Sequence, residues 1–289
     1  MITIRQDAIA ASFEEEGAEL VSLQKDGTEY LWNGDPVYWD RHAPILFPFV
    51  GRLERKKYFL RGREYPMGLH GFASRSRFSV RRESDSGVTF SLSDTEETRR
   101  CYPFQFRLEV HYVLQADGLC VTFLVQNLSE SEMYFGIGGH PGFRVPLEAG
   151  LRLEDYSLVW DEPGEPERIL FSERCLTTGR EEFKFPGKTG TLPLRRNLFD
   201  HDAIVLTGTG KRVRLCSESG TRAVEVIFPD MPYIGFWQPA FKDAPFLCIE
   251  PWATLPGRDG VEEHLETFPG MIGLAPGEAY RNTWEIRLL

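Results

Sequence analysis

Apolar and polar side chains alternate with a period of two along several short stretches of the chain. In residues 106–112 the even positions are apolar and the odd positions are charged or polar. This alternation is typical of a strand with one buried face. Other short runs rich in β-branched and aromatic residues predict further strands: ITIRQ, RFSVRR, GVTFSLS, LCVTFLVQNL, AIVL, AVEVIF and NTWEIRLL.

Turn signals separate these runs at short intervals, and the chain has 27 Gly and 19 Pro. Only residues 93–100 and 260–268 have a pattern that allows one or two helical turns. TGTGKR (207–212) lacks the spacing of a phosphate-binding loop and is interpreted as a hairpin turn. The pattern predicts an all-β protein, a large antiparallel β-sandwich with few short helices, forming a single domain over residues 1–289.

The charge balance limits the classes of partner. The formal net charge is −10, which opposes binding to nucleic acid phosphates or anionic membranes. No apolar run approaches the roughly 20 residues of a membrane span, and no export signal is recognisable. The five cysteines are widely spaced and lack a CxxC pair, so we expect reduced thiols in a cytoplasmic protein.

The segment FLCIEPW (246–252) places Glu250 among apolar residues. An ionised carboxylate is costly to bury, so the residue needs either a structural partner or a chemical role. Period two puts Phe246 and Cys248 on its face of the strand. We expect Pro251 to end this strand or to confine it to a sheet edge. In a dry site the pKa of Glu250 rises, as suits a general base near neutral pH.

Two of the six histidines lie beside glycines. His70 is in LHG and His140 is in GGHPG. Small neighbours allow a ligand or another backbone to approach an imidazole closely. The alternative is that the glycines only supply positive φ angles in a tight turn. Two such histidines together with a buried acid favour an acid–base site.

Other candidate side chains are polar or aromatic. Arg52 follows the apolar run ILFPFVG, and its planar group suits hydroxyl or carboxylate ligands; a salt bridge at a strand end is the alternative. Asp200 and Asp202 flank a histidine before a strand, and the sequence does not choose between them. Trp237 and Trp252 offer flat faces for sugar rings, although such residues commonly belong to a core.

The order of these motifs resembles the aldose 1-epimerase (galactose mutarotase-like) superfamily, and is most similar to its LacX-like branch. The resemblance rests on an arginine after an apolar run, then LHG, GHPGF, FDH and a late IEPW, and it covers nearly the whole chain. The chain differs from well-known mutarotases in having HGF for HGG, and Gly139 in place of an asparagine. The resemblance implies a β-sandwich with a sugar cleft on one sheet.

By matching motif positions, the resemblance implies that Glu250 is the general base and His140 the general acid. It implies that His70, Arg52 and Asp200, with Asp202 as the alternative, bind sugar hydroxyls. The expected reaction interconverts the α and β anomers of an aldose through its open chain, without metal or cofactor. We expect acid and base on opposite edges of one pyranose, a small sugar as partner, and a monomer or homodimer.

Three other interpretations remain open at this point. In the first interpretation the chain is a sugar-binding module without turnover. In the second it is a metal-dependent hydrolase with the two histidines and Glu250 as metal ligands. The third is an enzyme acting on a hexose 6-phosphate, whose phosphate requires nearby cations. The sequence offers four for that purpose: Arg55, Lys56, Lys57 and Arg75.

Overall fold

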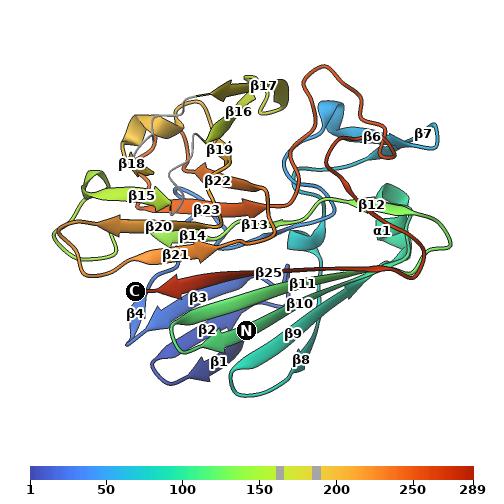
Figure 1. Cartoon of the computed structure of the whole chain (residues 1–289). Coiled ribbons are helices and arrows are strands. Elements are labelled where there is room, and N and C mark those ends of the chain that lie inside the picture. The colour runs from blue at the N-terminus through green and yellow to red at the C-terminus, as the bar shows by residue number, and fades with distance from the viewer. Residues whose placement is uncertain (161–165, 184–189) are drawn as a thin grey trace.

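The computed structural model describes residues 1–160, 166–183 and 190–289. Within these ranges the chain forms two large antiparallel sheets of nine and eight strands, together with three smaller sheets. In Figure 1 most strands of the eight-stranded sheet lie above the teal, green and red strands of the nine-stranded sheet. The prediction of an antiparallel, nearly all-β fold is confirmed.

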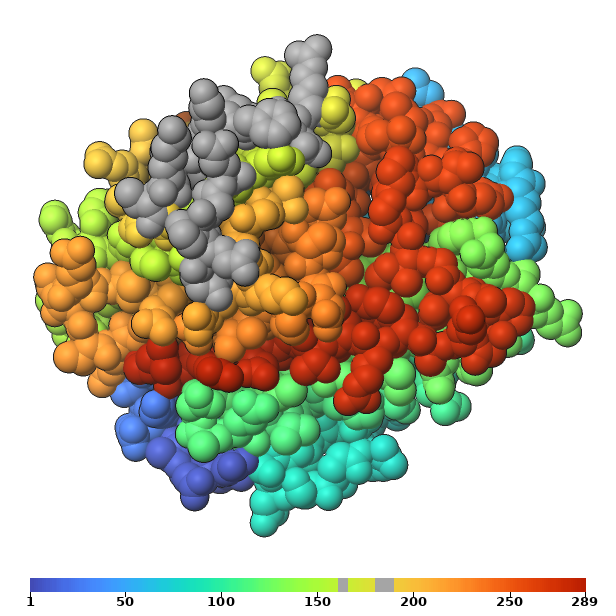
Figure 2. Space-filling model, viewed as in Figure 1, coloured from blue at the N-terminus to red at the C-terminus, as the bar shows by residue number. Residues whose placement is uncertain are grey.

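The nine-stranded sheet has the order β18-β15-β20-β21-β25-β11-β10-β9-β8. The alternation at residues 106–112 lies in β10, whose even positions are buried. The C-terminal strand β25 pairs with β21 on one side and β11 on the other, and Figure 2 shows this red segment crossing the face between orange and green segments. The strands are β8 (Ser79–Arg82), β9 (Gly87–Ser93), β10 (Phe106–Gln115), β11 (Gly118–Asn127), β15 (Tyr156–Trp160), β18 (Thr191–Pro193), β20 (Arg212–Ser217), β21 (Val224–Ile227) and β25 (Ala279–Leu288).

The eight-stranded sheet has the order β17-β16-β19-β22-β23-β13-β5, and β14 also pairs with β23. Leu247 and Ile249 of β23 enter the main hydrophobic core, which leaves the opposite face of this strand for other contacts. The strands are β5 (Ile45–Leu46), β13 (Gly138–Gly139), β14 (Gly142–Arg144), β16 (Glu167–Phe171), β17 (Thr177–Phe183), β19 (Ile204–Thr207), β22 (Tyr233–Trp237) and β23 (Phe246–Trp252).

The smaller sheets pack against this frame. Phe13 in the N-terminal sheet lies with its ring centroid 4.4 Å from that of Tyr112 and 5.7 Å from that of Phe90. One hydrophobic cluster runs from Ile4 to Leu288, which supports our proposal of a single domain. The strands are β1 (Ile2–Gln6), β2 (Ile9–Phe13), β3 (Leu20–Lys25), β4 (Thr28–Glu29), β6 (Lys57–Leu60), β7 (Arg63–Pro66), β12 (Met133–Phe135) and β24 (Ile272–Leu274).

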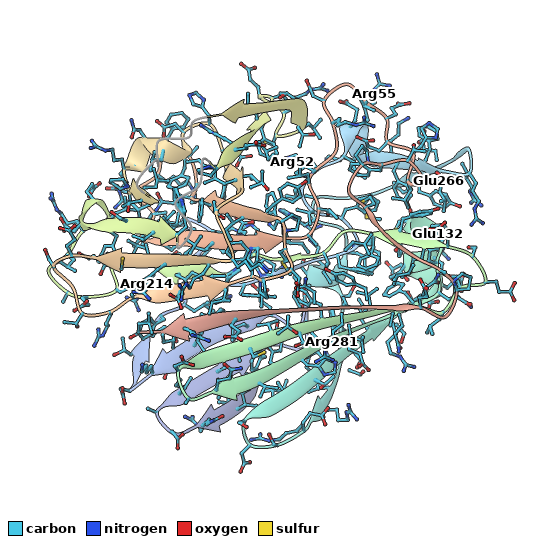
Figure 3. All side chains as sticks on the ribbon, viewed as in Figure 1. Arg52, Arg55, Glu132, Arg214, Glu266 and Arg281 are labelled. Carbon is cyan, nitrogen blue, oxygen red and sulfur yellow. The ribbon has the colours of Figure 1, made fainter. Side chains whose placement is uncertain are left out.

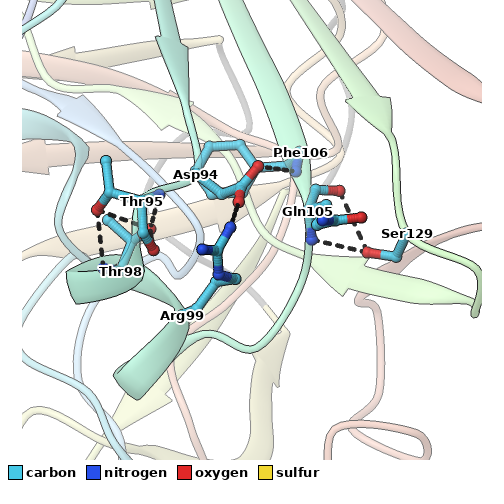
Figure 4. A network of polar contacts seen from close by, with 7 residues as sticks. All are labelled: Asp94, Thr95, Thr98, Arg99, Gln105, Phe106 and Ser129. Atoms are coloured by element: carbon cyan, nitrogen blue, oxygen red, sulfur yellow. Dashed lines mark hydrogen bonds and ion pairs between the residues drawn. The ribbon is translucent and has the colours of Figure 1, made fainter.

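Helices in the described ranges are short. Helix α1 (Glu96–Cys101) begins after Thr95, whose side chain accepts a hydrogen bond from the Thr98 backbone N–H while Thr98 bonds back to Thr95. This capping box and the contact of Asp94 with Arg99 appear in Figure 4. The 3₁₀ segments are η1 (Glu54–Lys56), η2 (Ala73–Arg75), η3 (Leu153–Asp155) and η4 (Arg196–Phe199). None of the described helices has the length and apolar character that crossing a bilayer requires.

The helical expectation for residues 260–268 is wrong. The backbone of this segment bonds to β6 at two points: Phe59 N–H donates to Glu263 at 2.8 Å, and Leu265 N–H donates to Phe59 at 2.8 Å. Within the segment, Thr267 N–H donates to His264 at 2.9 Å, which closes a single turn and not a helix. Gly260, at φ +73°, turns the chain into this extended path. Since these backbone groups bond to β6, pairing with the neighbouring strand replaces the local helix.

The hairpin interpretation of residues 207–212 is also wrong. Strand β19 ends at Thr207 in the eight-stranded sheet, and β20 begins at Arg212 in the nine-stranded sheet. Each strand already has a neighbour on both sides, β16 and β22 for β19 and β15 and β21 for β20. The loop therefore carries the chain from one large sheet to the other.

Pro251 neither ends β23 nor confines it to an edge. The strand continues to Trp252 with β22 on one side and β13 and β14 on the other. Ile249 and Ala253 donate backbone hydrogen bonds to Pro141 and Ile137. Pro251 has no N–H to donate, and it lies where the partner strand is interrupted between β13 and β14.

Candidate active site

Strand β23 presents Glu250 on the face that is turned away from the main core. Phe246 and Cys248 share this face, as predicted, in a cluster that also contains Trp32. The Glu250 side chain is 1% exposed and contributes to the wall of a cavity. Gly235, directly opposite on β22, leaves room for it, because a Cβ there would lie 3.3 Å from the Glu250 Cβ.

The cavity beside Glu250, here called the site cavity, has a volume of about 410 Å³. This volume is in the range of small-molecule sites. Its wall combines ends of the eight-stranded sheet with loops from elsewhere in the chain. The lining residues come from segments 39–46, 51–52, 69–75, 171–175, 202–203 and 250–256, together with His140 and Trp237.

His140 lies against Glu250 in this wall. Its Nε2 is 3.2 Å from Glu250 Oε2, within ion-pair distance, although the two groups are not aligned as a hydrogen bond. The backbone N–H of His140 donates to Pro44 at 3.1 Å, and the ring of Trp39 stacks on its imidazole with centroids 5.0 Å apart. The two side chains therefore meet directly, and their placement on opposite edges of a pyranose stays a prediction.

The glycines before His140 provide space rather than unusual backbone angles. A Cβ at Gly139 would lie 2.6 Å from the ring of Trp284, and one at Gly138 would lie 2.9 Å from the ring of Trp252. Contacts this short are not tolerated, so a side chain at either position would push the strand away from the aromatic rings. These glycines thereby let the backbone bring His140 close to β23.

Burial dominates the electrostatics of the pair. It raises the pKa of Glu250 well above its usual value, and the nearby carboxylate of Asp202 adds to the rise. Burial also lowers the pKa of His140 well below its usual value. Both shifts favour uncharged groups. The pair therefore holds a single dissociable proton, mainly as a carboxylic acid beside a neutral imidazole.

His70 lines the site cavity next to this pair, with its ring centroid 5.5 Å from that of His140. Its Nδ1 accepts a hydrogen bond from Gly51 N–H at 3.0 Å. Burial, followed by the charges of Arg52 and Arg75, lowers the pKa of His70 to about 3. The ring is therefore neutral, with its proton on Nε2 as a hydrogen-bond donor.

The backbone of the LHG motif is unusual. His70 has φ +59° and Gly71 has φ +73°. A Cβ at Gly71 would lie 2.2 Å from the carbonyl oxygen of Phe47. Here the glycine supplies both a left-handed conformation and space, and the turn holds His70 against the chain near Gly51.

The structure distinguishes the two aspartates. Asp202 lines the site cavity, and its Oδ1 accepts a 3.0 Å hydrogen bond from the indole N–H of Trp237. Asp200 follows η4 as its C-cap and is not among the described residues of the cavity wall. Asp202 also has φ +74°, a left-handed conformation that aspartate tolerates better than most residues.

Arg52 lines the site cavity with an exposed side chain. Figure 3 labels it between β6 and the region of β16 and β17. The wall also contains Arg75, which the sequence offers as a cation for a phosphorylated sugar, and Trp39 and Cys175, which were not predicted. Trp39 and Cys175 lie in loops without a recognisable motif. Burial raises the pKa of the Cys175 thiol, with the neighbouring Asp202 adding to the rise.

The loop containing Trp39 is held in place by an ion pair with Glu19, which directly precedes β3. Glu19, which is 5% exposed, accepts hydrogen bonds from His42 N–H at 2.7 Å and from Arg41 Nε at 2.9 Å. Arg41 in turn donates to the backbone of Ser74 at 2.7 Å. This network fixes the 39–46 wall against the segment that follows His70.

The profile of the family described as Aldose 1-epimerase matches residues 1–287. The chain therefore belongs to the aldose 1-epimerase family, as the motif order predicts. It is 34% identical over 299 residues to the protein called "Protein LacX, plasmid" from Lactococcus lactis subsp. lactis, covering 100% of this chain and 99% of the relative.

Solved structures support the same assignment. A galactose mutarotase related enzyme from Lactobacillus acidophilus superposes with a TM-score of 0.95 at 33% identity, covering 100% of this chain and 97% of that one. A galactose mutarotase-like protein from Lactobacillus casei ATCC 334 superposes with a TM-score of 0.94 at 34% identity, covering 100% of both chains. The fold is thus galactose mutarotase-like.

Proposed function

We propose that this chain is a mutarotase that interconverts the α and β anomers of an aldose. The observation that carries the proposal is the contact between His140 and Glu250, which places a proton donor and a proton acceptor 3.2 Å apart in the wall of one cavity. Family membership adds independent support.

The chemistry needs two proton transfers, one from the anomeric oxygen O1 and one to the ring oxygen O5. The anomeric hydroxyl and the ring oxygen are both bonded to C1 of the sugar, so an acid and a base in contact can reach both. Transfer of the shared proton from Glu250 to His140 prepares a carboxylate and an imidazolium. Glu250 then takes the proton of the anomeric hydroxyl, and the C1–O1 bond becomes a carbonyl. The ring C1–O5 bond breaks as O5 takes the proton from His140.

Ring opening returns the pair to a carboxylic acid and a neutral imidazole, the form that burial favours. Rotation about C1–C2 presents the other face of the aldehyde. The reverse transfers close the ring as the other anomer. Each positioned acid or base typically contributes about 10²–10⁴-fold, so the pair provides acceleration from its own residues.

The remaining residues of the wall would bind the sugar. His70 offers an Nε2–H donor, and Asp202 offers a carboxylate oriented by Trp237. Arg52 offers a planar set of donors. The indole rings of Trp39 and Trp237 lie in the same wall and suit the apolar C–H faces of a pyranose.

A phosphorylated aldose is a second candidate substrate, favoured by the two arginines of the wall. Arg52 and Arg75 line the site cavity, both with exposed side chains. The other cations considered from the sequence fit less well. Lys57 pairs with Glu64 at 2.7 Å and with Glu262 at 3.0 Å, and Arg55 pairs with Glu262 at 3.3 Å.

The test is optical rotation of freshly dissolved α-glucose and α-galactose, followed with and without the purified protein in a weakly catalytic buffer. The proposal predicts a rate that grows in proportion to protein concentration and disappears after heat inactivation. Adding glucose 6-phosphate as a competitor tests the second candidate substrate. A phosphorylated substrate predicts that the phosphate ester inhibits the reaction more strongly than glucose does at the same concentration. Sugar binding without acceleration would instead indicate a non-catalytic binding protein.

A further inference from the structure

Cys248 forms a compact group with the two residues of the acid–base pair. One ligand atom from each of His140, Cys248 and Glu250 can be chosen so that all three lie within 4.8 Å of one another. All three residues are buried, with Cys248 at 0% and Glu250 at 1% exposure. In the described part of the chain, His70 does not join this group, so it differs from the two-histidine set considered from the sequence.

Two features distinguish this group from ordinary core packing. Glu250 Oε2 is buried and accepts no hydrogen bond from the described residues, because His140 Nε2 at 3.2 Å is close to it but not aligned with it. A buried carboxylate oxygen without a hydrogen bond is costly. Cys248 and Glu250 also lie two residues apart on β23, so the backbone of the strand sets their side chains on the same face. The three side chains are therefore held in place before any ligand arrives.

We infer that this group is a binding site for a thiophilic divalent cation such as Zn²⁺, and that the cation competes with the sugar. Nitrogen, thiolate and carboxylate are the three ligand types that zinc accepts in proteins. Glu250 and His140 face the site cavity, which leaves an open position for water. Binding displaces the thiol and carboxyl protons to solvent.

The consequence for catalysis is inhibition. A cation held by His140 Nε2 and Glu250 occupies the atoms that the proposed reaction uses as acid and base. Thiolate ligands discriminate against Mg²⁺ and Ca²⁺, which prefer oxygen. Metal binding itself does not depend on the proposed function, whereas the inhibition does rest on it.

The experiment uses Co²⁺ as a spectroscopic probe on the full chain, because Co²⁺ bound by a thiolate gives a charge-transfer absorption in the near ultraviolet. We expect a single Co²⁺ per chain with this band, displaced by Zn²⁺ but not by Mg²⁺. Cys248→Ser should lose the band and weaken Zn²⁺ binding by more than about 100-fold, since even outer-shell partners contribute 10–100-fold. Cys216→Ser, which removes a partly exposed thiol on β20, is the matched control and should bind like the unaltered protein.

Glu250→Gln is a second, independent variant, which keeps the thiol and removes the carboxylate. It should also weaken Zn²⁺ binding, and it keeps the test valid if Cys248→Ser folds poorly. Absence of the thiolate band in the unaltered protein, or equal binding by all variants, would overturn the site. Where mutarotation is measurable, Zn²⁺ should slow it and sugar should weaken Zn²⁺ binding; acceleration by Zn²⁺ would contradict the inhibitory role while leaving the binding result intact.

Discussion

His140 Nε2 lies 3.2 Å from Glu250 Oε2, although the two residues come from separate strands and loops of the eight-stranded sheet. The contact forms because β13 and β14 both pair with β23, and the chain between them carries His140 past Glu250. Burial then sets the charge of both groups. The proposed chemistry follows from this one shared proton.

The pH dependence of mutarotation should be bell-shaped and broad. Activity falls on the acid side when the pair gains a second proton, and on the alkaline side when it loses its only one. Because the pKa of His140 is lowered from 6.5 and that of Glu250 is raised from 4.5, the active range should extend beyond the interval between those ordinary values. Initial rates by polarimetry between pH 4 and pH 9 measure it. A narrow optimum confined to that interval would contradict the assignment.

Asp202→Asn should move only the alkaline limb of that profile, and should move it to lower pH. The Asp202 carboxylate raises the pKa of Glu250, so removing its charge makes the shared proton easier to lose. The asparagine keeps an oxygen that can accept the Trp237 hydrogen bond. Asp200→Asn, outside the described cavity wall, is the matched control. A shift of equal size in both variants would show that the effect is not local.

His70→Asn should reduce kcat/KM without changing the shape of the pH profile. Asparagine tolerates the left-handed backbone at this position, and the variant loses the Nε2 donor. Loss of one hydrogen bond predicts a decrease of roughly three- to tenfold. The pKa of His70 is lowered to about 3, so its titration lies outside the measured range. His264→Asn, at an exposed histidine that stacks on Phe59, should leave kcat/KM unchanged.

Glu250→Gln should gain stability relative to the unaltered protein as the pH rises. The folded-state pKa of Glu250 is raised above 4.5, so its contribution to stability is fully present below that value and is lost as pH rises through the folded pKa. Glutamine does not titrate. The difference in free energy of unfolding between the two proteins should therefore change by about 1 kcal/mol or more between pH 4.5 and pH 8. Urea titrations at several pH values measure it, and a difference independent of pH would contradict burial of an ionisable Glu250.

The fold was predictable because its strands have strong local signals. Alternation marks β10, and runs of β-branched and aromatic residues mark β1, β9 and β11. The pairing of distant strands has no such local signal, and the errors arise there. Residues 260–268 bond to β6, and Pro251 sits in a central strand only because its neighbour is interrupted at that point.

The candidate site was partly predictable. Glu250 stands out as an acid among apolar residues, and the histidines stand out beside glycines. Asp200 and Asp202 are separated by one residue at the end of η4, so only the three-dimensional path of the chain shows which one lines the cavity. Trp39 could not be found from sequence, because Glu19, which lies before β3 and far from Trp39 in the sequence, holds its loop in the cavity wall.

The most direct test of the acid–base pair is the rate of anomer exchange, measured by magnetisation transfer between the α and β signals of the sugar. The measurement compares the unaltered protein with Glu250→Gln and His140→Gln at equal concentration and saturating sugar. We predict that each variant still binds sugar but loses at least about 100-fold in exchange rate. Exchange at the unaltered rate in either variant would contradict the pair as the source of catalysis.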